Sequence, residues 1–282
     1  MAQLVDDFQF SQTSLQDYVD CRRRFYLRWI QQLAWPAAPA EPLEDVERHI
    51  LAGQIFHRMV HQKIIGIPDA LLERYLSVDE SGNLETWWAN IHPLLEDLEY
   101  SGAVLLPEVV LAGRLGSARL IAKLDLLAIL PDGRLLIYDW KTSLKRPERT
   151  WMEKRLQTRI YPYMALRIET RGSRAPLSKF QGIEMVYWYA NFPSQPERFA
   201  YSTELADEDD NYLRRLITEI QGLEKEDFHL TSKLTICRFC IYRSYCERGG
   251  RAGEWKSSED MVEDLEMEPV DLDIEQIGEI PY

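Results

Sequence analysis

The chain has 282 residues, of which 45% are hydrophobic and 28% charged, and its formal net charge is −13. These proportions are close to those of ordinary globular proteins, so they exclude a largely disordered chain, a collagen-like repeat and a small disulfide scaffold. No uncharged apolar run approaches the roughly 18 residues that a membrane span needs, and the first residues are acidic, unlike a signal peptide. We therefore expect a cytoplasmic protein with no membrane partner and with reduced cysteines.

The negative charge is concentrated at one end of the sequence. Residues 252–282 contain eleven acidic residues and one lysine, so this segment accounts for −10 of the total charge. The rest of the chain is close to neutral, and a nucleic-acid partner, which would be bound through Lys and Arg, is not excluded. Residues 258–282 are predicted to form a disordered acidic tail, which either aids solubility or mimics the charge of nucleic acid.

The hydrophobic pattern predicts helices first, then strands with helices between and after them. The expected helices cover residues 11–32, 44–65, 69–77, 84–100, 147–170 and 207–223. The expected strands cover residues 104–115, 117–130, 134–142, 182–190 and 197–203. Ser14 is the expected N-cap of the first helix, Pro162 should kink the fifth helix, and residues 131–133 form a hairpin turn. This order predicts a mixed β-sheet flanked by helices.

Charged residues in two neighbouring strands form a candidate catalytic site. Side chains alternate between the faces of a strand, so Asp139 and Lys141 share one face of strand 134–142. The hairpin would place Asp125, an acid among apolar residues, beside Asp139. Two adjacent carboxylates repel each other unless a cation separates them, and oxygen ligands favour Mg²⁺ or Mn²⁺. The alternative is a surface ion pair between Asp139 and Lys141, with Asp125 at a bulge.

The helix expected after these strands is basic. Its basic residues, counted with those just before it, are Lys145, Arg146, Arg149, Lys154, Arg155 and Arg159. Gln157 and Tyr161 lie one turn apart and share a face. A basic surface beside a metal site suits a polyanionic substrate, although an ordinary amphipathic helix would also carry exposed charge.

The four cysteines form the second candidate site. Cys237, Cys240 and Cys246 lie within ten residues of one another, whereas Cys21 lies in the first expected helix. The spacing favours one site that uses all four thiols, and both zinc and an iron-sulfur cluster accept four thiolates. Such a site would join the N-terminal helix to the C-terminal segment. A zinc-protease motif at His57 and His61 is rejected, because Arg58 stands where that motif needs its glutamate.

Six segments, in this order, resemble the PD-(D/E)XK nuclease superfamily. They are residues 10–26, 53–57, Asp125, 139–141, 157–161 and the three C-terminal cysteines, and together they span residues 9–248. The similarity is greatest to the RecB-like branch, which includes iron-sulfur nucleases of helicase-nuclease complexes and of CRISPR adaptation. Leu124 departs from the pattern, since the family name has proline before the first aspartate.

The resemblance implies an α/β, restriction-endonuclease-like fold within a single nuclease domain at residues 1–257. The expected parts are a helical region at 11–101, a nuclease core at 102–203, and a helix with an iron-sulfur segment at 204–251. The implied metal ligands are His57, Asp125, Asp139 and the backbone carbonyl of Trp140. The implied catalytic residues are Lys141, Gln157 and Tyr161, and the implied 4Fe-4S ligands are Cys21, Cys237, Cys240 and Cys246. Glu108 either supports the metal as an outer carboxylate or second-metal ligand, or lies on the surface.

The resemblance also implies a function. The expected activity is Mg- or Mn-dependent DNA cleavage, by an exonuclease acting on single strands or ends in repair or recombination, with a helicase as partner. One alternative is a CRISPR-adaptation nuclease with its own partner. Another is a DNA-binding scaffold subunit with an idle nuclease site, although the presence of His57, Asp125, Asp139 and Lys141 disfavours it.

Overall fold

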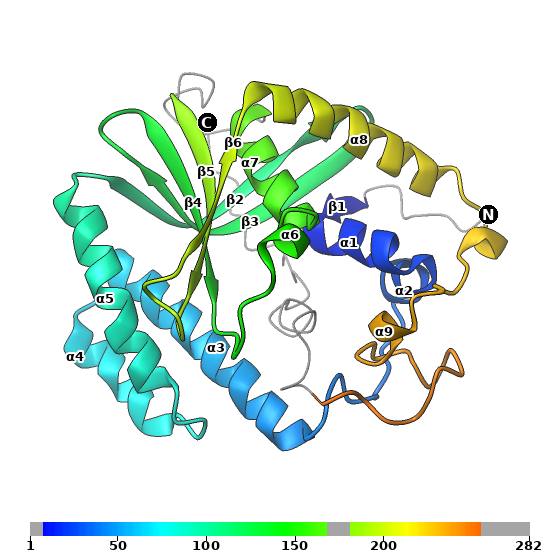
Figure 1. Cartoon of the computed structure of the whole chain (residues 1–282), viewed down its shortest axis with the longest axis horizontal. Coiled ribbons are helices and arrows are strands. Elements are labelled where there is room, and N and C mark those ends of the chain that lie inside the picture. The colour runs from blue at the N-terminus through cyan, green and yellow to red at the C-terminus, as the bar shows by residue number, and fades with distance from the viewer. Residues whose placement is uncertain (1–7, 168–180, 255–282) are drawn as a thin grey trace, which may run out of the picture.

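A six-stranded mixed sheet forms the centre of the molecule, for which the computed structural model describes residues 8–167 and 181–254 (Figure 1). The strands are β1 (Gln9–Ser11), β2 (Val104–Leu115), β3 (Ala118–Ile129), β4 (Arg134–Lys141), β5 (Gly182–Tyr189) and β6 (Glu197–Tyr201). Strand order is β1-β3-β4-β5-β6, and β2 pairs with β3. The β1–β3 and β4–β5 pairs are parallel, whereas the β2–β3, β3–β4 and β5–β6 pairs are antiparallel.

Helices lie on both sides of this sheet (Figure 1). They are α1 (Gln12–Asp20), α2 (Arg22–Phe25), α3 (Leu43–Ile64), α4 (Asp69–Leu72), α5 (Leu84–Tyr100), α6 (Arg149–Met152), α7 (Leu156–Arg167), α8 (Thr203–Gln221) and α9 (Leu234–Cys237). A π-helical turn at Tyr26–Ile30 follows α2, and a 3₁₀ turn at Glu73–Val78 follows α4. Among the described residues, no helix has both the length and the hydropathy needed to cross a membrane.

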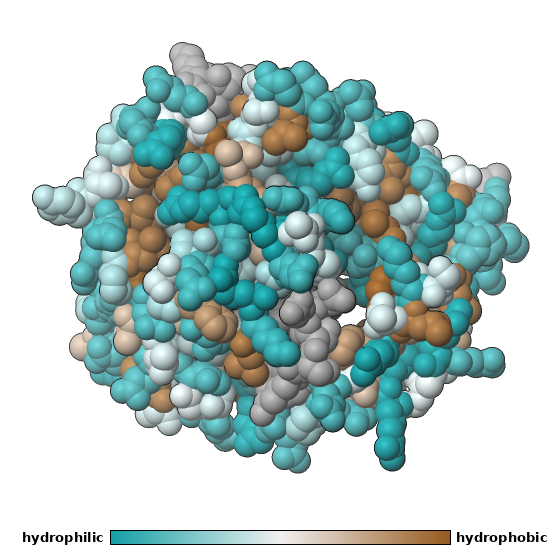
Figure 2. Space-filling model, viewed as in Figure 1, coloured by the Kyte–Doolittle hydropathy of each residue, from teal (hydrophilic) through white to brown (hydrophobic). Residues whose placement is uncertain are grey.

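The two faces of the sheet support two hydrophobic cores. Leu136, Tyr138 and Trp140 of β4 pack with α3 and α5 in one core. Leu135 and Ile137 pack with α1, α7 and α8 in the other. This alternation is the expected two-residue period of a strand. Continued along β4, it directs positions 139 and 141 toward α7. The outer surface in Figure 2 is largely hydrophilic, with apolar residues in scattered patches.

The structure confirms the predicted order from the first helix to α8, but it adds strand β1 before that helix and helix α9 after α8, and it corrects several details. Ser11, not Ser14, is the N-cap of α1, and Ser14 completes a reciprocal capping box with it. The first expected helix is interrupted at Cys21, which has an extended backbone (φ −159°, ψ 107°). The helix expected at 147–170 is two helices, α6 and α7, joined by a turn; Pro162 lies inside α7. The predicted acidic tail and residues 168–170 lie outside the described residues.

Candidate active site

The end of β4 holds a buried ion pair that a residue of α7 supports. Lys141 Nζ lies 2.8 Å from Asp139 Oδ2, and both side chains are 8% exposed, so the surface-pair interpretation is wrong. Gln157 Nε2 donates a hydrogen bond to Asp139 Oδ1 at 2.6 Å, and Gln157 Oε1 accepts one from Lys141 Nζ at 3.5 Å. Buried charges are costly unless paired and hydrogen-bonded. Gln157 therefore fixes both members of the pair.

Asp125 and His57 lie beside this pair. The β3–β4 pairing ends at Leu126 and Tyr138, and Asp125 and Asp139 are the next residues on the two strands. Asp125 Oδ2 accepts the backbone N–H of Trp140 at 2.8 Å, and its Oδ1 lies 3.4 Å from His57 Nδ1. Burial raises the pKa of the Asp125 carboxyl, but His57, the Trp140 N–H and Lys141 outweigh burial and hold it below its usual value. Asp125 is thus ionised at neutral pH.

Gly53 explains how α3 brings His57 to the end of the sheet. A Cβ at position 53 would lie 3.0 Å from Thr142 Oγ1, just beyond β4. This distance is tighter than ordinary van der Waals contact, so a glycine lets α3 approach the strand end closely. His57 lies one turn farther along the same helix face. The Gly53–His57 spacing therefore has a structural cause.

β2 and β3 are irregular beside the site. Leu124 packs in the core next to α7, whereas Leu126 packs in the core next to α3, although residues two apart normally share a face. On β2, Glu108 is skipped between the pairs Pro107–Leu126 and Val109–Leu124, and its φ is +53°. Residues other than glycine rarely adopt this left-handed backbone conformation, and such positions often occur at functional sites. Glu108 forms an ion pair with Lys123.

Tyr161 follows Gln157 by one turn of α7 and is buried. Burial, followed by the negative charge of Asp139, raises the pKa of Tyr161 well above its usual value, and a hydrogen bond with Gln157 opposes the shift only in part. The phenol therefore stays protonated and remains a hydrogen-bond donor. The predicted shared face of Gln157 and Tyr161 is confirmed.

The basic residues expected to contact DNA fall into two groups. Four of them pair with acids of the fold: Arg146 and Arg149 with Glu197, Arg155 with Asp20, and Arg159 with Asp209. Two are exposed and have no described ion pair in residues 8–167 and 181–254, namely Lys145 and Lys154. Most of the positive charge that the sequence suggested is thus neutralised within the protein.

The four cysteines are free thiols of intermediate burial. Burial raises the pKa of Cys237 and Cys246, and it raises that of Cys240 to about 12; Cys21 adds to the shift in each case. Arg24 opposes the shift at Cys237 and Cys240, so this arginine favours their thiolates. Cys21 therefore lies close enough to each C-terminal cysteine to affect its pKa.

Neither candidate site is arranged as a finished metal centre. Within the part of the chain that the structure describes, no group of three or more His, Cys, Asp and Glu side chains is placed to hold a metal ion. The chemistry of the donors nonetheless fits: two carboxylates and an imidazole suit a hard divalent cation, and four thiols suit zinc or iron. Lys141 balances the charge of Asp139, and His57 lies beside Asp125.

Two structural features of the site were not found from the sequence. Gln16 Oε1 accepts the backbone N–H of Leu156, the first residue of α7, at 3.0 Å. Asp17 is buried and binds Arg24, Arg28 and the Trp29 indole N–H. Gln16 and Asp17 both lie in the N-terminal motif at residues 10–26. The motif indicated a function, but it did not indicate which residues these two side chains contact.

The family profile of the PD-(D/E)XK nuclease superfamily matches residues 9–247, and the chain belongs to this superfamily. The six-stranded mixed sheet flanked by helices fits the restriction-endonuclease-like fold expected from the sequence. Members of the superfamily are nucleic-acid hydrolases that generally use divalent metals. The comparison therefore shows that the buried Asp139–Lys141 pair lies in a protein of the nucleic-acid hydrolase class.

Comparison with curated proteins gives no match. Among solved structures, one similar chain is a candidate exonuclease from Eubacterium rectale, with a TM-score of 0.46 and 10% identity, covering 78% of this chain and 84% of that one. A second is the protein SSO0001, with a TM-score of 0.38 and 14% identity, covering 84% of this chain and 85% of that one.

Proposed function

We propose that the protein is a Mg- or Mn-dependent deoxyribonuclease that acts on single-stranded DNA or on DNA ends. The observation that carries the proposal is the buried Asp139–Lys141 pair, bridged by Gln157, beside an ionised Asp125. Family membership supplies the reaction class, and these residues supply the carboxylates and the cation that phosphodiester hydrolysis needs. Repair or recombination is the proposed setting, with CRISPR adaptation as the alternative.

Each residue has a proposed role in this reaction. The metal would be held by His57, Asp125, Asp139 and the Trp140 carbonyl. The bound cation would polarise the phosphoryl group and lower the pKa of a water molecule. Lys141 would orient that water and offset negative charge in the transition state. Gln157 would keep Lys141 in place, and the protonated hydroxyl of Tyr161 would donate to the DNA backbone.

Fewer basic residues are proposed to contact the DNA backbone than the sequence suggested. Lys145 and Lys154 are exposed and flank α6. The other four basic residues already have acidic partners, so their first role would be to hold the helices in place and not to contact a phosphate. They are Arg146, Arg149, Arg155 and Arg159. Glu108, at its strained position opposite Asp125, remains a proposed carboxylate for a second metal or for the outer part of the site.

We also propose that Cys21, Cys237, Cys240 and Cys246 hold one 4Fe-4S cluster, with zinc as the alternative. The proposal is supported by the mutual electrostatic effects of the thiols and by the nearby arginines, since a thiolate-bound centre is negatively charged. The site would connect the break between α1 and α2 to the C-terminal segment of a single domain at residues 1–257. Its role would be structural, because it closes a long loop.

The decisive experiment is a cleavage assay with full-length protein purified without oxygen. End-labelled linear single-stranded and duplex DNA and circular single-stranded DNA are incubated with Mn²⁺, and the products are resolved by size. We expect degradation of linear single strands, loss of activity in the Asp139→Asn variant, and full activity in the matched Asp132→Asn variant, whose carboxylate is exposed on the β3–β4 turn. Wild-type protein without metal-dependent cleavage would contradict the proposal.

A further inference from the structure

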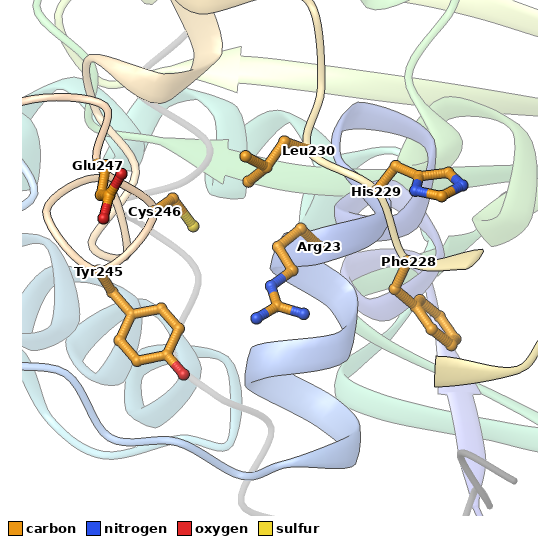
Figure 3. A pocket seen from close by; sticks show the side chains of 7 residues that line it. All are labelled: Arg23, Phe228, His229, Leu230, Tyr245, Cys246 and Glu247. Carbon is orange, nitrogen blue, oxygen red and sulfur yellow. The ribbon is translucent and has the colours of Figure 1, made fainter. Parts of the chain in front are cut away.

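A cavity of about 480 Å³ lies beside α2 (Figure 3), and none of its lining residues belongs to the proposed nuclease site. Its lining residues are Arg23, Phe228, His229, Leu230, Tyr245, Cys246 and Glu247. They come from α2, from the segment after α8, and from the C-terminal segment. We call this space the Arg23 cavity. Its volume is within the range of sites that bind small molecules or single nucleotides.

Arg23 differs from the arginines beside it. Arg22 pairs with Glu219, and Arg24 and Arg28 pair with Asp17. Arg23 has no ion pair among the contacts that the structure describes; its guanidinium lies 5.3 Å from the ring centroid of Tyr26. In Figure 3 its side chain extends between Phe228 on one side and Tyr245 and Cys246 on the other. The Arg23 guanidinium thus lines the cavity without an ion pair to a described carboxylate.

The backbone around Arg23 is held in place. The Arg23 N–H donates to the His229 carbonyl at 3.2 Å, which joins α2 to the other wall of the cavity. Glu247 contributes a carboxylate to the lining, at a left-handed backbone position (φ +57°). No ion pair between Glu247 and Arg23 is found in the described part of the chain. The cavity therefore keeps a cation that an anionic ligand can bind.

An aromatic side chain lies at the edge of the same cavity. Tyr245 is 42% exposed, and its ring packs edge-to-face on Trp35 with 5.1 Å between the centroids. Trp35 is itself fixed by a hydrogen bond from Nε1 to Ser244 Oγ at 2.9 Å. Leu230, 44% exposed, adds an apolar surface. A held aromatic ring beside a cation is the combination by which proteins bind unpaired nucleotides without sequence preference.

The cavity adjoins the cysteine site, with which it shares Cys246, but does not coincide with it. Of the four cysteines, only Cys246 lines it, so it is not the space that a four-thiolate centre would fill. The wall formed by Phe228 is buried and packs on Phe25 and Tyr26, which gives the cavity a rigid floor. The charge, the aromatic ring and the rigid floor therefore point to a ligand site of its own.

We propose that the Arg23 cavity binds one nucleotide unit of single-stranded DNA, with its phosphate at Arg23 and its base against Tyr245 and Leu230. The inference rests on the proposed nuclease function and extends it with a second contact for the substrate strand. A paired base is excluded from such a contact because both of its faces are stacked within the duplex. The site therefore favours single strands over duplexes and holds the strand at a distance from the metal-binding residues.

The test measures binding, so that it does not depend on cleavage. Full-length Asp139→Asn protein, prepared without oxygen and assayed without added Mg²⁺ or Mn²⁺, is titrated into fluorescently labelled dT20, an abasic 20-mer and a 20-base-pair duplex. Arg23→Gln should weaken binding of dT20 and of the abasic strand about tenfold. Tyr245→Ala should weaken binding of dT20 about tenfold, since it removes the ring against which one base stacks, and should leave the abasic strand unaffected.

The matched control is Tyr100→Ala, because Tyr100 is 97% exposed and lies at the end of α5, away from the cavity. It should bind all three ligands like the parent protein. Circular dichroism establishes that each variant is folded; if Arg23→Gln is not, the Tyr245→Ala comparison alone decides. Unchanged dT20 affinity in Tyr245→Ala overturns the proposal. So does displacement of dT20 by inorganic phosphate or dTMP at equal concentration, since the cavity would then bind free nucleotides.

The two proposals fail in different ways. Loss of dT20 affinity in the cavity variants, together with no cleavage by the wild-type protein, would overturn the nuclease proposal and keep the DNA site. Metal-dependent cleavage by the wild-type protein, together with unchanged binding by both cavity variants, would overturn the cavity and keep the nuclease.

Discussion

The side chain of Gln16 in α1 accepts the backbone N–H of Leu156 at the start of α7. The first N–H groups of a helix lack partners within it, so Gln16 satisfies a donor that would otherwise be buried and unpaired. The next residue of α7, Gln157, binds both Asp139 and Lys141. The N-terminal motif is therefore connected to the active site through two hydrogen-bonded glutamines.

Substitution of Gln16 tests this connection. Gln16→Ala should lower the free energy of unfolding by about 1–3 kcal/mol, because it leaves the buried Leu156 N–H without an acceptor. It should also reduce cleavage, since α7 carries Gln157. Urea unfolding and the cleavage assay measure the two effects. Gln31→Ala, at an exposed position, is the control; equal stability of both variants would show that Gln16 does not support α7.

Lys141 and the proposed metal balance the same carboxylates. Lys141→Met should abolish cleavage and, without metal, should lower the free energy of unfolding by about 3–5 kcal/mol, because Asp139 would be left as a buried charge without its cation. Mn²⁺ should then raise the Tm of the variant more than that of the wild type, since the ion would replace the lost charge. Thermal unfolding with and without Mn²⁺ measures this difference. Equal Tm shifts in both proteins would argue against a metal beside Asp139.

The close approach of α3 to β4 gives a third prediction. Gly53→Ala should reduce cleavage and lower the free energy of unfolding by at most about 2 kcal/mol, because the added Cβ would displace the helix that carries His57, whereas alanine recovers about 1 kcal/mol of helix propensity. The double variant Gly53→Ala/Thr142→Ala removes the opposing Oγ1, so it should recover part of both losses. Urea unfolding and cleavage rates measure the recovery. A double variant no better than Gly53→Ala would show that the contact with Thr142 is not the cause.

Part of this site could be predicted from the sequence because it depends on local periodicity. The alternation along β4 placed Asp139 and Lys141 on one face, and a short turn set the register that brought Asp125 beside them. The contact of Gln16 with Leu156 joins residues 140 positions apart, and no local pattern encodes such a pairing. The ion pair of Arg155 with Asp20 also joins residues far apart in the sequence, so no local pattern predicts it either. β1 has three residues, too few for a period to appear.

A buried histidine outside the site predicts a pH dependence of stability. Burial lowers the pKa of His49 from 6.5 to about 4. Between these values the unfolded chain binds a proton that the folded protein does not, so the contribution of His49 to stability should fall as the pH drops from about 6.5 to about 4 and should change no further below that. The contribution is about 3 kcal/mol. Urea unfolding across this pH range should show a smaller loss in His49→Gln than in the control His61→Gln.

The cysteine site gives the last prediction. Protein isolated without oxygen should be brown and contain about four irons per chain, if the four thiolates hold one cubane cluster. Cys21→Ala should be as damaging to iron content and stability as Cys240→Ala, because each supplies one corner of a site that joins the α1–α2 break to the C-terminal segment. Iron analysis and thermal unfolding of both variants measure this equivalence. A colourless protein with one zinc per chain would show that the site holds zinc and not an iron-sulfur cluster. Full stability of Cys21→Ala would show that Cys21 is not part of the site.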